Sequence, residues 1–434
     1  MQKTVALHTL GCKLNYSETT ALGRMLEQDG FTKKDFDEVA DVYVINTCSV
    51  TDNADKECRQ IVRKIKRQAP QALVVITGCY AQLKPKQIAE IPGVNLVIGA
   101  AEKFNIALHL KELSKNDATK VCSCDIEEVN IFVPSNSTNE RTRVFLKVQD
   151  GCNYTCSFCT IPMARGKSRS DDIQNIVQNV KTIALDGAKE IVLTGINLGD
   201  FGKGNPNQAP AISEVKNLYL KKNDENFFEL IKALDAQNDI ARYRISSIEP
   251  NLLSNEIIEF VATSNHFMPH FHIPLQSGSN NILATMRRRY KKELYAEKVA
   301  LIKKLMPHCC IGVDVIVGFP GETEADFLET VHFLTTLDIS YLHVFTYSER
   351  DNTHALTIKP IVPVQIRNER NKILRSLSYQ KMQAFTYSNI GQTRPVLFES
   401  VNKNGMMEGY TDNYIKIITP YKKEWENEIV GWKV

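Results

Sequence analysis

Three cysteines lie within one short stretch of the chain, and their spacing constrains the fold more than any other feature. They are Cys152, Cys156 and Cys159, separated by three and then two residues. A loop with this spacing can wrap one face of a 4Fe-4S cluster, but it supplies only three of the four iron ligands. A ferredoxin-like carrier would have a fourth cysteine close by, and the next one here is Cys309. The pattern therefore predicts an iron–sulfur loop with one iron open to a small molecule; three unligated thiols are the alternative.

The residues around this loop resemble those of the radical S-adenosylmethionine (SAM) enzymes. The cysteine spacing matches that superfamily, and the following run TIPMARG, residues 160–166, is most similar to its methylthiotransferase branch. In that branch the open iron binds the amino and carboxylate groups of SAM, and one electron cleaves SAM to a 5′-deoxyadenosyl radical. The resemblance covers nearly the whole chain. It implies SAM both as radical source and as methyl donor.

The composition is that of a globular protein with a mild positive charge. The 434 residues suffice for two to four domains of ~100–200 residues each. The net charge of +3 permits a nucleic-acid partner without requiring one. Eleven cysteines, an odd number spread along the chain, are unlike a secreted disulfide framework. The N-terminus is not signal-like and no run approaches ~18 apolar residues, so we expect a cytoplasmic protein without a membrane span.

The first part of the chain alternates between apolar runs and amphipathic segments. The apolar runs predict strands at residues 4–10, 41–46, 72–77 and 96–99. Helical patterns between them cover about residues 15–28, 54–67 and 85–90. Strands that alternate with helices favour a parallel, doubly wound sheet. We therefore predict an N-terminal α/β domain over residues 1–118.

A cysteine follows each of the first three predicted strands: Cys12, Cys48 and Cys79. The carboxyl ends of parallel strands share one edge of a sheet, where ligands bind, so these distant residues should converge in space. Coincidence is the alternative, although positions after strands usually hold Gly, Asn, Asp or Ser. The flanking residues resemble three N-terminal motifs of the methylthiotransferases, which implies a second, auxiliary 4Fe-4S cluster that binds the sulfur to be transferred. Cys58 falls within a helix and is expected to pack in the core.

A connector over residues 111–141 follows, and its polar run at residues 134–140 is expected to mark a domain boundary. Cys122 and Cys124 in this connector are expected to pack rather than to bind a metal. The polar segment at residues 205–226 is expected to be an insertion or loop.

Beyond the connector, six apolar runs alternate with helical patterns. The predicted strands lie at residues 144–148, 191–194, 243–248, 271–275, 311–317 and 342–345. They favour a partial (β/α)6 barrel over residues 138–370, with its chemistry at the carboxyl ends of the strands. The cysteine loop follows the first of these strands and therefore belongs on that face.

Residues after the barrel strands match the SAM-binding elements of the family. By this resemblance the run TGIN, which ends at Asn197, lies where the methionyl amino group is held, and Glu249 lies near the ribose or carboxylate. His270 and His272 lack a third histidine and are expected to be structural or to orient a ligand. The full set of candidate SAM contacts is Thr194, Gly195, Asn197, Glu249, Gln276, Gly318 and Phe345.

Residues 371–434 differ from the rest. After a basic helix, short β-like runs are separated by Asn, Gly and Asp turns, which favours a small β-barrel. This segment resembles the TRAM domain, an RNA-binding barrel found in the methylthiotransferases. Basic runs at residues 63–67 and 287–292 are further candidate phosphate contacts. Aromatic residues of the segment could stack on bases or pack in a barrel core, and they are Tyr410, Tyr414, Tyr421, Trp425 and Trp432.

The resemblance as a whole implies a tRNA methylthiotransferase. Three branches modify isopentenyladenosine in tRNA, N6-threonylcarbamoyladenosine in tRNA, or an aspartate of a ribosomal protein. The first cysteine motif, TLGCKLN, is most similar to the threonylcarbamoyladenosine branch, since the isopentenyl branch has Tyr and Gln in place of Leu10 and Lys13. We therefore expect a methylthio group to be placed on carbon 2 of that base at tRNA position 37, within the anticodon stem-loop.

The carboxylate of the threonyl group predicts a cationic pocket. Arg165 and Lys167 follow the cysteine loop and are candidate cations for it. A flavodoxin or ferredoxin is the expected electron donor. The rival hypothesis is a non-catalytic iron–sulfur protein that binds RNA or senses redox state, but a sensor needs exposed cysteines and no SAM-binding barrel.

Overall fold

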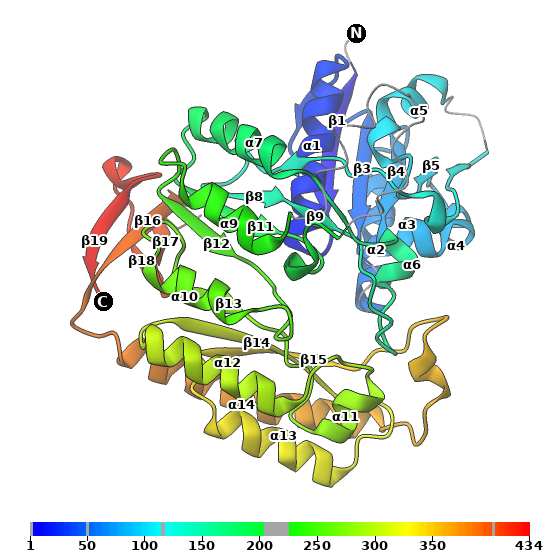
Figure 1. Ribbon diagram of the computed structural model, residues 1–434. Coiled ribbons are helices and arrows are strands. Elements are labelled where there is room, and N and C mark those ends of the chain that lie inside the picture. The colour runs from blue at the N-terminus through cyan, green and yellow to red at the C-terminus, as the bar shows by residue number, and fades with distance from the viewer. Residues whose placement is uncertain (1–2, 49–51, 114–117, 204–224, 402–403) are drawn as a thin grey trace, which may run out of the picture.

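The computed structural model describes residues 3–48, 52–113, 118–203, 225–401 and 404–434. An N-terminal α/β domain lies beside a central arc of parallel strands, and a C-terminal antiparallel sheet completes the molecule. Figure 1 shows the N-terminal part in blue and cyan next to the green half of the arc, with the yellow and orange half below it. In the part of the chain that the structure describes, no helix is long and apolar enough to cross a membrane.

The N-terminal sheet has six parallel strands in the order β2-β1-β3-β4-β5-β6. They are β1 (Thr4–Thr9), β2 (Thr32–Lys34), β3 (Val42–Thr47), β4 (Leu73–Gly78), β5 (Leu96–Ile98) and β6 (Lys120–Cys122). The helices are α1 (Lys13–Gln28), α2 (Asp52–Gln68), α3 (Cys79–Leu83), α4 (Pro85–Ala89) and α5 (Ile106–Glu112). The predicted strands and helices are confirmed, and the short strands β2 and β6 and the helices α3 and α5 are added to them.

Alternate residues of β3 explain why helices cover both faces of this sheet. Val42 and Val44 lie in the core shared with α1 and α5, whereas Tyr43 and Ile45 lie in the core shared with α2, α3 and α4. Burial on both faces makes the strands nearly continuous apolar runs. The strand order reverses between β1 and β3. The loops after these two strands therefore flank the switch point at which ligands bind in such sheets.

Six parallel strands with outer helices form the central arc, as predicted. Its strands are β8 (Arg143–Lys147), β11 (Glu190–Thr194), β12 (Arg242–Ile245), β13 (His270–His272), β14 (Cys310–Val317) and β15 (Tyr341–Thr346). Bridges from Tyr243 to Phe267 and from Ser247 to His272 join the β8–β11–β12 half to the β13–β14–β15 half. The helices are α7 (Ile173–Leu185), α9 (Phe227–Asp235), α10 (Asn255–Thr263), α11 (Asn280–Thr285), α12 (Lys292–Leu305), α13 (Glu324–Thr336) and α14 (Val364–Tyr387).

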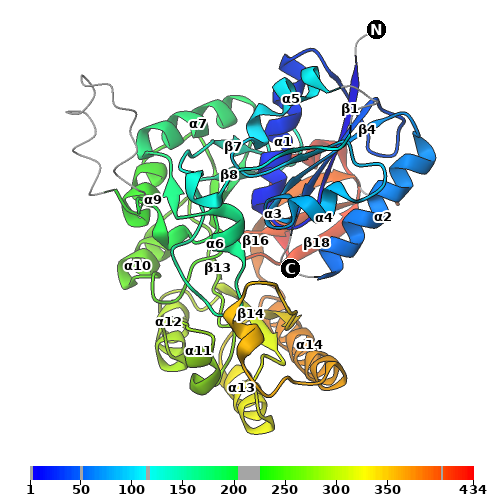
Figure 2. The ribbon, with the colours of Figure 1, turned by 90° about the vertical axis from the view of Figure 1, so that its right-hand side faces the viewer.

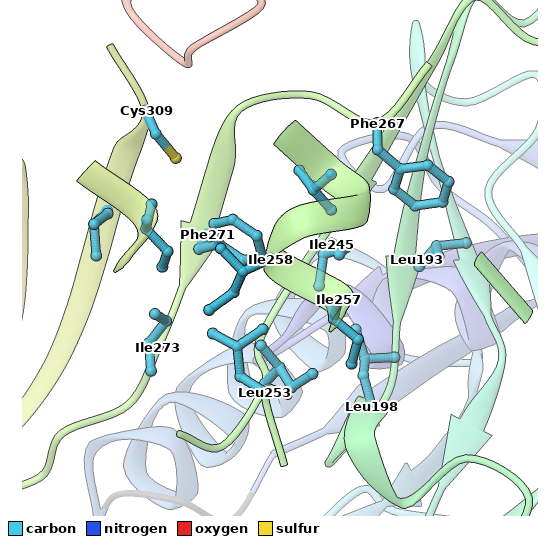
Figure 3. Close-up of a cluster of buried hydrophobic side chains, with 14 of the residues drawn as sticks. Leu193, Leu198, Ile245, Leu253, Ile257, Ile258, Phe267, Phe271, Ile273 and Cys309 are labelled. Atoms are coloured by element: carbon cyan, nitrogen blue, oxygen red, sulfur yellow. The ribbon is translucent and has the colours of Figure 1, made fainter. Parts of the chain in front are cut away.

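One apolar core fills the space between this arc and its helices. Figure 3 shows Leu193 of β11, Phe271 of β13 and Ile257 of α10 meeting in it. Cys309 belongs to the same core and is fully buried. It therefore packs as a small apolar side chain. Cys58 is likewise fully buried in the N-terminal core, as predicted.

The connector is part of the fold. β6 extends the N-terminal sheet, and β7 (Ser135–Asn136) pairs antiparallel with β8. The polar run expected at a boundary therefore contains a strand, and the hydroxyl of Ser135 is hydrogen-bonded to that of Ser17 in α1 at 3.1 Å. Polar composition was misleading here because the polar atoms are satisfied inside the protein. Cys122 packs partly against the N-terminal core, whereas the expected insertion at 205–226 lies almost entirely outside the described residues.

The C-terminal segment forms a four-stranded antiparallel sheet in the order β18-β17-β16-β19, which Figure 2 shows in orange and red. Trp425 and Trp432 pack on Phe398 in its core, with ring centroids 5.3 and 5.7 Å from that of Phe398. Arg242 of β12 donates to the Pro395 carbonyl at 2.7 Å and so fixes the sheet to the barrel. The strands are β16 (Thr393–Val401), β17 (Met406–Thr411), β18 (Lys416–Pro420) and β19 (Ile429–Lys433).

Candidate active site

The loop with the closely spaced cysteines is held between β9 (Gln149–Asp150) and α6 (Ile161–Arg165) at the carboxyl end of β8. Gly151 opens it with a φ of +70°, and a Cβ there would lie 2.0 Å from the Lys167 carbonyl oxygen. In the middle of the loop, the Ser157 N–H donates to the Met286 carbonyl at 3.1 Å and its hydroxyl donates to the Thr285 carbonyl at 2.9 Å. The loop is therefore anchored to the protein at its start and at its centre.

Each of the three sulfurs in this loop accepts a hydrogen bond. Cys152 and Cys159 accept from the backbone N–H two residues later, both at 3.4 Å, and Cys156 accepts from Arg288 at 3.2 Å. Such bonds favour the thiolate, which is the metal-binding form of cysteine. Burial raises the pKa of Cys152 to about 11 and that of Cys159 to about 12, and the neighbouring Cys156 adds to both shifts. The three sulfurs therefore lie close enough to influence one another.

Cys12, Cys48 and Cys79 come together at one edge of the N-terminal sheet. Cys12 caps α1, Cys48 directly follows β3, and Cys79 begins α3. A Cβ on Gly11 would lie only 2.5 Å from the Cys48 Cβ, so the loops after β1 and β3 are in contact. Burial raises the pKa of Cys79; Arg165 opposes this shift and Cys12 adds to it. The loops with these cysteines thus meet where the strand pattern placed them.

Asn15 and Thr47 hold these loops together. The Asn15 amide donates to the Leu10 carbonyl at 2.8 Å and to the Thr47 carbonyl at 3.0 Å, and the Thr47 hydroxyl donates to the Thr77 carbonyl. Within the described ranges, no group of three or more His, Cys, Asp or Glu side chains is arranged around a single metal ion. A 4Fe-4S cluster takes its cysteines on separate irons, so they stand further apart than the ligands of one ion. Two sets of three cysteines suit clusters rather than single ions.

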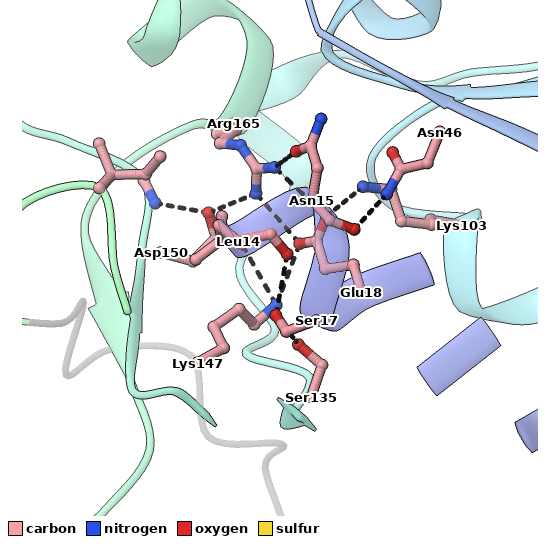
Figure 4. Close-up of polar contacts among 12 residues, drawn as sticks. Leu14, Asn15, Ser17, Glu18, Asn46, Lys103, Ser135, Lys147, Asp150 and Arg165 are labelled. Atoms are coloured by element: carbon pink, nitrogen blue, oxygen red, sulfur yellow. Dashed lines mark hydrogen bonds and ion pairs between the residues drawn. The ribbon is translucent and has the colours of Figure 1, made fainter. Parts of the chain in front are cut away.

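A buried network of charges joins α1 to the base of the cysteine loop (Figure 4). Glu18 pairs with Lys103 at 2.6 Å and with Arg165 at 3.0 Å, and Asp150 pairs with Arg165 at 3.0 Å. Burial raises the pKa of both carboxyl groups, but the surrounding cations, Arg165 foremost, bring the pKa of each below its usual range. Four bases face two acids in this network: Lys103, Lys147, Arg165 and Arg169 with Glu18 and Asp150.

Neither cation proposed from sequence for the substrate carboxylate is placed to bind it. Arg165 is 4% exposed, and its guanidinium donates to Glu18, Asp150 and Asn15. The prediction for Arg165 is therefore wrong, because groups within the protein already satisfy its donors. Lys167 is exposed, and it is not among the residues that line the large cavity described below.

The candidate SAM contacts after β11 occupy two environments. Thr194 and Gly195 line the large cavity, although the Thr194 hydroxyl also donates to the Leu146 carbonyl at 3.0 Å. The Asn197 amide donates to Asp200 at 2.8 Å. Its buried Oδ1 finds no hydrogen-bond donor among the described residues. An unpaired buried acceptor is costly, and the ammonium of a bound amino acid moiety would satisfy it.

The remaining candidates follow β12, β13 and β14. Glu249 forms an ion pair with Arg288, the residue that also donates to Cys156, so this carboxylate lies beside the cysteine loop. Gln276 has a φ of +69°, in the left-handed region, at the carboxyl end of β13. A Cβ on Gly318 would lie 2.3 Å from Cγ of Arg367, a residue of α14. Close packing against α14 therefore accounts for this glycine without a ligand.

A cavity of about 1110 Å³ opens among the three parts of the molecule. The loop after β1 contributes Cys12 and Lys13, and the barrel contributes residues along its strands, Phe345 of β15 among them. Helix α14 and the C-terminal sheet complete the wall. This volume exceeds the ~300–1,000 Å³ of most small-molecule pockets. The cavity is therefore large enough for a modified nucleoside together with a second small molecule.

Sequence reasoning left open whether Tyr414 stacks on bases or packs in a core, and it missed Lys13 as a residue of this wall. Tyr414 of the C-terminal sheet stacks on His270 at 4.3 Å and on Tyr410 at 5.0 Å, so it faces the cavity rather than the core of its own sheet. Burial raises the pKa of Tyr414, but Lys13 and Arg143 lower it more, which places cations around this phenol. The available signal for Lys13 was its position directly after a strand-end cysteine.

Arg288 was also assigned wrongly within its basic run. The sequence suggested contact with RNA phosphates, yet its side chain is 4% exposed and is bound to Glu249 and Cys156. Its neighbour Arg289 lies over the Tyr154 ring at 3.9 Å. Arg288 and Arg289 therefore contact the cysteine loop, whereas Arg287 and Lys291 of the same run are exposed.

Known protein families match the same parts of the chain. Residues 4–99 match uncharacterized protein family UPF0004, and residues 146–334 match the radical SAM superfamily. The threonylcarbamoyladenosine tRNA methylthiotransferase MtaB of Bacillus subtilis is 38% identical over 441 residues, which cover 99% of this chain and 93% of that protein. Its namesake from Aquifex aeolicus is 40% identical over 430 residues and 98% of each chain. The chain belongs to the tRNA methylthiotransferase family.

A relative from a second branch is also similar to this methylthiotransferase. A tRNA-2-methylthio-N(6)-dimethylallyladenosine synthase of Clostridium botulinum is 32% identical over 413 residues, 92% of this chain and 86% of that protein. Among solved structures, the radical SAM methyltransferase TsrM of Kitasatospora setae, with cobalamin and a [4Fe-4S] cluster bound, has a TM-score of 0.54 at 16% identity and covers 80% of this chain and 75% of its own. That likeness shows the fold alone. As a radical SAM protein, the methylthiotransferase uses SAM and a 4Fe-4S cluster.

Proposed function

We propose that this enzyme places a methylthio group on carbon 2 of N6-threonylcarbamoyladenosine at position 37 of tRNA. One observation carries the proposal: Cys12 and the ends of the barrel strands, Thr194 and Gly195 included, line the same cavity. A base bound there would lie next to Cys12 of the N-terminal cysteine set and next to the strand ends of the barrel. The relatives named for threonylcarbamoyladenosine support this base, and isopentenyladenosine is the alternative.

The six cysteines of the two loops would divide between two 4Fe-4S clusters. Cys152, Cys156 and Cys159 would hold the radical SAM cluster, and an auxiliary cluster would be held by Cys12, Cys48 and Cys79. When bound, the clusters and SAM supply the radical, the sulfur and the methyl group. The chain's own residues orient these groups: Asn197 would accept from the methionyl ammonium of SAM. The other proposed SAM contacts are Thr194, Gly195, Glu249, Gln276, Gly318 and Phe345.

The buried charge network supports the auxiliary site. Its four bases outnumber its two acids, and an uncompensated charge in a protein interior is strongly unfavourable. Further negative charge on the side of the network next to Cys79 would therefore stabilise it. Against burial, which lowers it, Glu18 and the thiols of Cys79 and Cys12 already raise the pKa of Arg165. Thiolates bound to iron would supply that charge.

The three regions would share the work of binding tRNA. Residues 1–118 would form the auxiliary-cluster domain, residues 138–370 the radical SAM core and residues 371–434 a TRAM-like RNA-binding domain. The target adenine lies in a single-stranded anticodon loop, so taking it out of its stack costs little free energy. A flavodoxin or ferredoxin would deliver the electron.

Mass spectrometry of nucleosides tests the substrate. Reconstituted enzyme, SAM and reductant are mixed anaerobically with otherwise identical tRNAs that carry adenosine, isopentenyladenosine or N6-threonylcarbamoyladenosine at position 37. The methylthio product is expected from the last tRNA, at a rate roughly ten- to a hundredfold above the others if one charge-assisted hydrogen bond reads the carboxylate. Equal rates on all three would contradict the assignment.

Two triple variants test the division between the clusters. Replacement of Cys152, Cys156 and Cys159 by Ala is expected to leave about four irons per chain, since each cube holds four. Replacement of the other three cysteines by Ala is expected to retain formation of 5′-deoxyadenosine but to abolish methylthio product. Loss of all iron in the first variant, or normal product in the second, would refute separate roles for the two sites.

A further inference from the structure

Lys13 differs from the other cations around the large cavity. It is the first residue of α1, it is exposed, and it lines the cavity. Within the described ranges, no carboxylate lies at ion-pair distance from its ammonium group. The positive end of the α1 dipole lies at the same place and adds to its attraction for anions.

The neighbouring cations already have partners. Arg143 pairs with Glu399 at 2.5 Å, and Arg244 pairs with Glu190 at 2.9 Å. Lys416 lines the same cavity, and its ammonium is 2.8 Å from the Glu408 carboxylate. The ammonium of Lys13 is thus available to bind an anion that enters the cavity.

We propose that Lys13 is the specificity-determining residue that binds the carboxylate of the threonylcarbamoyl group. This inference rests on the proposed function and names the contact by which the substrate is chosen. N6-threonylcarbamoyladenosine carries a carboxylate on its N6 substituent, whereas the isopentenyl group is apolar and uncharged. A lysine in a cavity prefers the charged group, because an apolar one would remove water from the ammonium without replacing its hydrogen bonds.

The surroundings of Lys13 favour a carboxylate on the base over a backbone phosphate. Lys13 lines the cavity together with Tyr414, a residue stacked on His270 of the barrel wall, and it lowers the pKa of the Tyr414 phenol. The same wall includes Thr194 and Gly195, at the end of β11. A base that reaches these strand ends brings its N6 substituent into the cavity, whereas phosphate contacts only position the backbone and carry no information about the base.

Binding measurements with three RNAs test this contact. Anticodon stem-loops that differ only at position 37, with adenosine, isopentenyladenosine or N6-threonylcarbamoyladenosine, are titrated with holoenzyme by fluorescence anisotropy without reductant. Lys13→Met is expected to weaken binding of the threonylcarbamoyl RNA by about ten- to a hundredfold, while binding of the other two changes by less than about twofold. Lys13→Arg keeps the charge and is expected to restore most of the preference.

Lys416→Met is the matched control, because it removes a cavity cation that is already paired; it is expected to change the affinity for all three RNAs by the same factor. Iron content is measured in each variant, since Lys13 adjoins Cys12. Equal weakening of all three RNAs by Lys13→Met would identify a phosphate contact and overturn the inference, as would an undiminished preference for the threonylcarbamoyl RNA. In the separate assay with reductant, wild-type enzyme that forms no methylthio product on any RNA would instead refute the proposed function.

Discussion

Arg165 and Lys167 show how differently two cations close in the sequence can behave. Arg165 is buried and bound to Glu18 and Asp150, whereas Lys167 is exposed. Removing Arg165 breaks buried, hydrogen-bonded ion pairs with Glu18 and Asp150 at once, which costs much more than losing an exposed charge. The same substitution should therefore have unequal effects at the two positions.

Arg165→Ala is expected to destabilise the protein by about 3–5 kcal/mol, because Glu18 and Asp150 lose a shared cation in a buried network. Lys167→Ala is the control and should stay within about 0.5 kcal/mol of the wild type. Anaerobic urea unfolding, followed by far-ultraviolet circular dichroism, measures both. Similar stabilities for the two variants would show that the network contributes little to folding.

At the scale of single elements, the shape of the cysteine loop depends on its first residue. Gly151 and Gly187 both have left-handed backbone, with φ values of +70° and +85°. A Cβ on Gly187 would meet nothing within 4 Å, whereas one on Gly151 would lie 2.0 Å from a carbonyl oxygen. Alanine substitutions at these two glycines therefore distinguish the free-energy cost of left-handed backbone from the cost of a steric clash.

Gly187→Ala is expected to cost about 1–2 kcal/mol, the penalty for left-handed backbone, and to leave the iron content unchanged. Gly151→Ala meets the same penalty and in addition must move the loop, so we expect it to lose the iron held by that loop. Iron analysis and anaerobic assay of 5′-deoxyadenosine check this. Full iron content in Gly151→Ala would mean that the loop tolerates the shift.

At the scale of the whole molecule, the cavity exists only because three parts of the chain meet. Tyr414 from the C-terminal sheet closes it by stacking on His270 of β13, while Tyr421 of the same segment packs against the core of that sheet. Arg242 ties the sheet to β12 through two carbonyl oxygens, at 3.2 and 2.7 Å. The C-terminal sheet is therefore part of the wall around a bound base.

Tyr414→Ala is expected to raise the KM for tRNA about tenfold, since two aromatic contacts of ~0.5–1.5 kcal/mol each shape that wall. Formation of 5′-deoxyadenosine without tRNA should not change, because the Tyr414 ring stacks on His270 and Tyr410 rather than on the cysteine loop in the barrel. Tyr421→Ala serves as the matched aromatic control and should leave the KM nearly unaltered. A normal KM for tRNA in Tyr414→Ala would show that the C-terminal sheet does not contribute to substrate binding through this residue.

The sequence by itself determined the main strands and the positions of the cysteine loops. β3 and β4 are predictable because both of their faces are buried, which makes them continuous apolar runs. The loops with Cys12 and Cys48 are predictable because parallel strands end at one edge of a sheet. Both inferences depend on local pattern alone. The branch of the family could also be read from the residues around Cys12.

Only the tertiary structure decided which polar groups are partnered. The strand β7 is polar and short. It forms because its backbone pairs with β8 and its Ser135 hydroxyl is hydrogen-bonded to Ser17 of α1. Arg165 meets Glu18 across 147 positions of sequence, so no local pattern reveals that its charge is bound. Lys13 is left facing the cavity because the cations around it are already paired: Arg143 and Arg244 with acids from distant segments, and Lys416 with Glu408 on the adjacent strand. Which charged groups form ion pairs depends on how the elements pack, and that packing depends on residues far apart in the sequence.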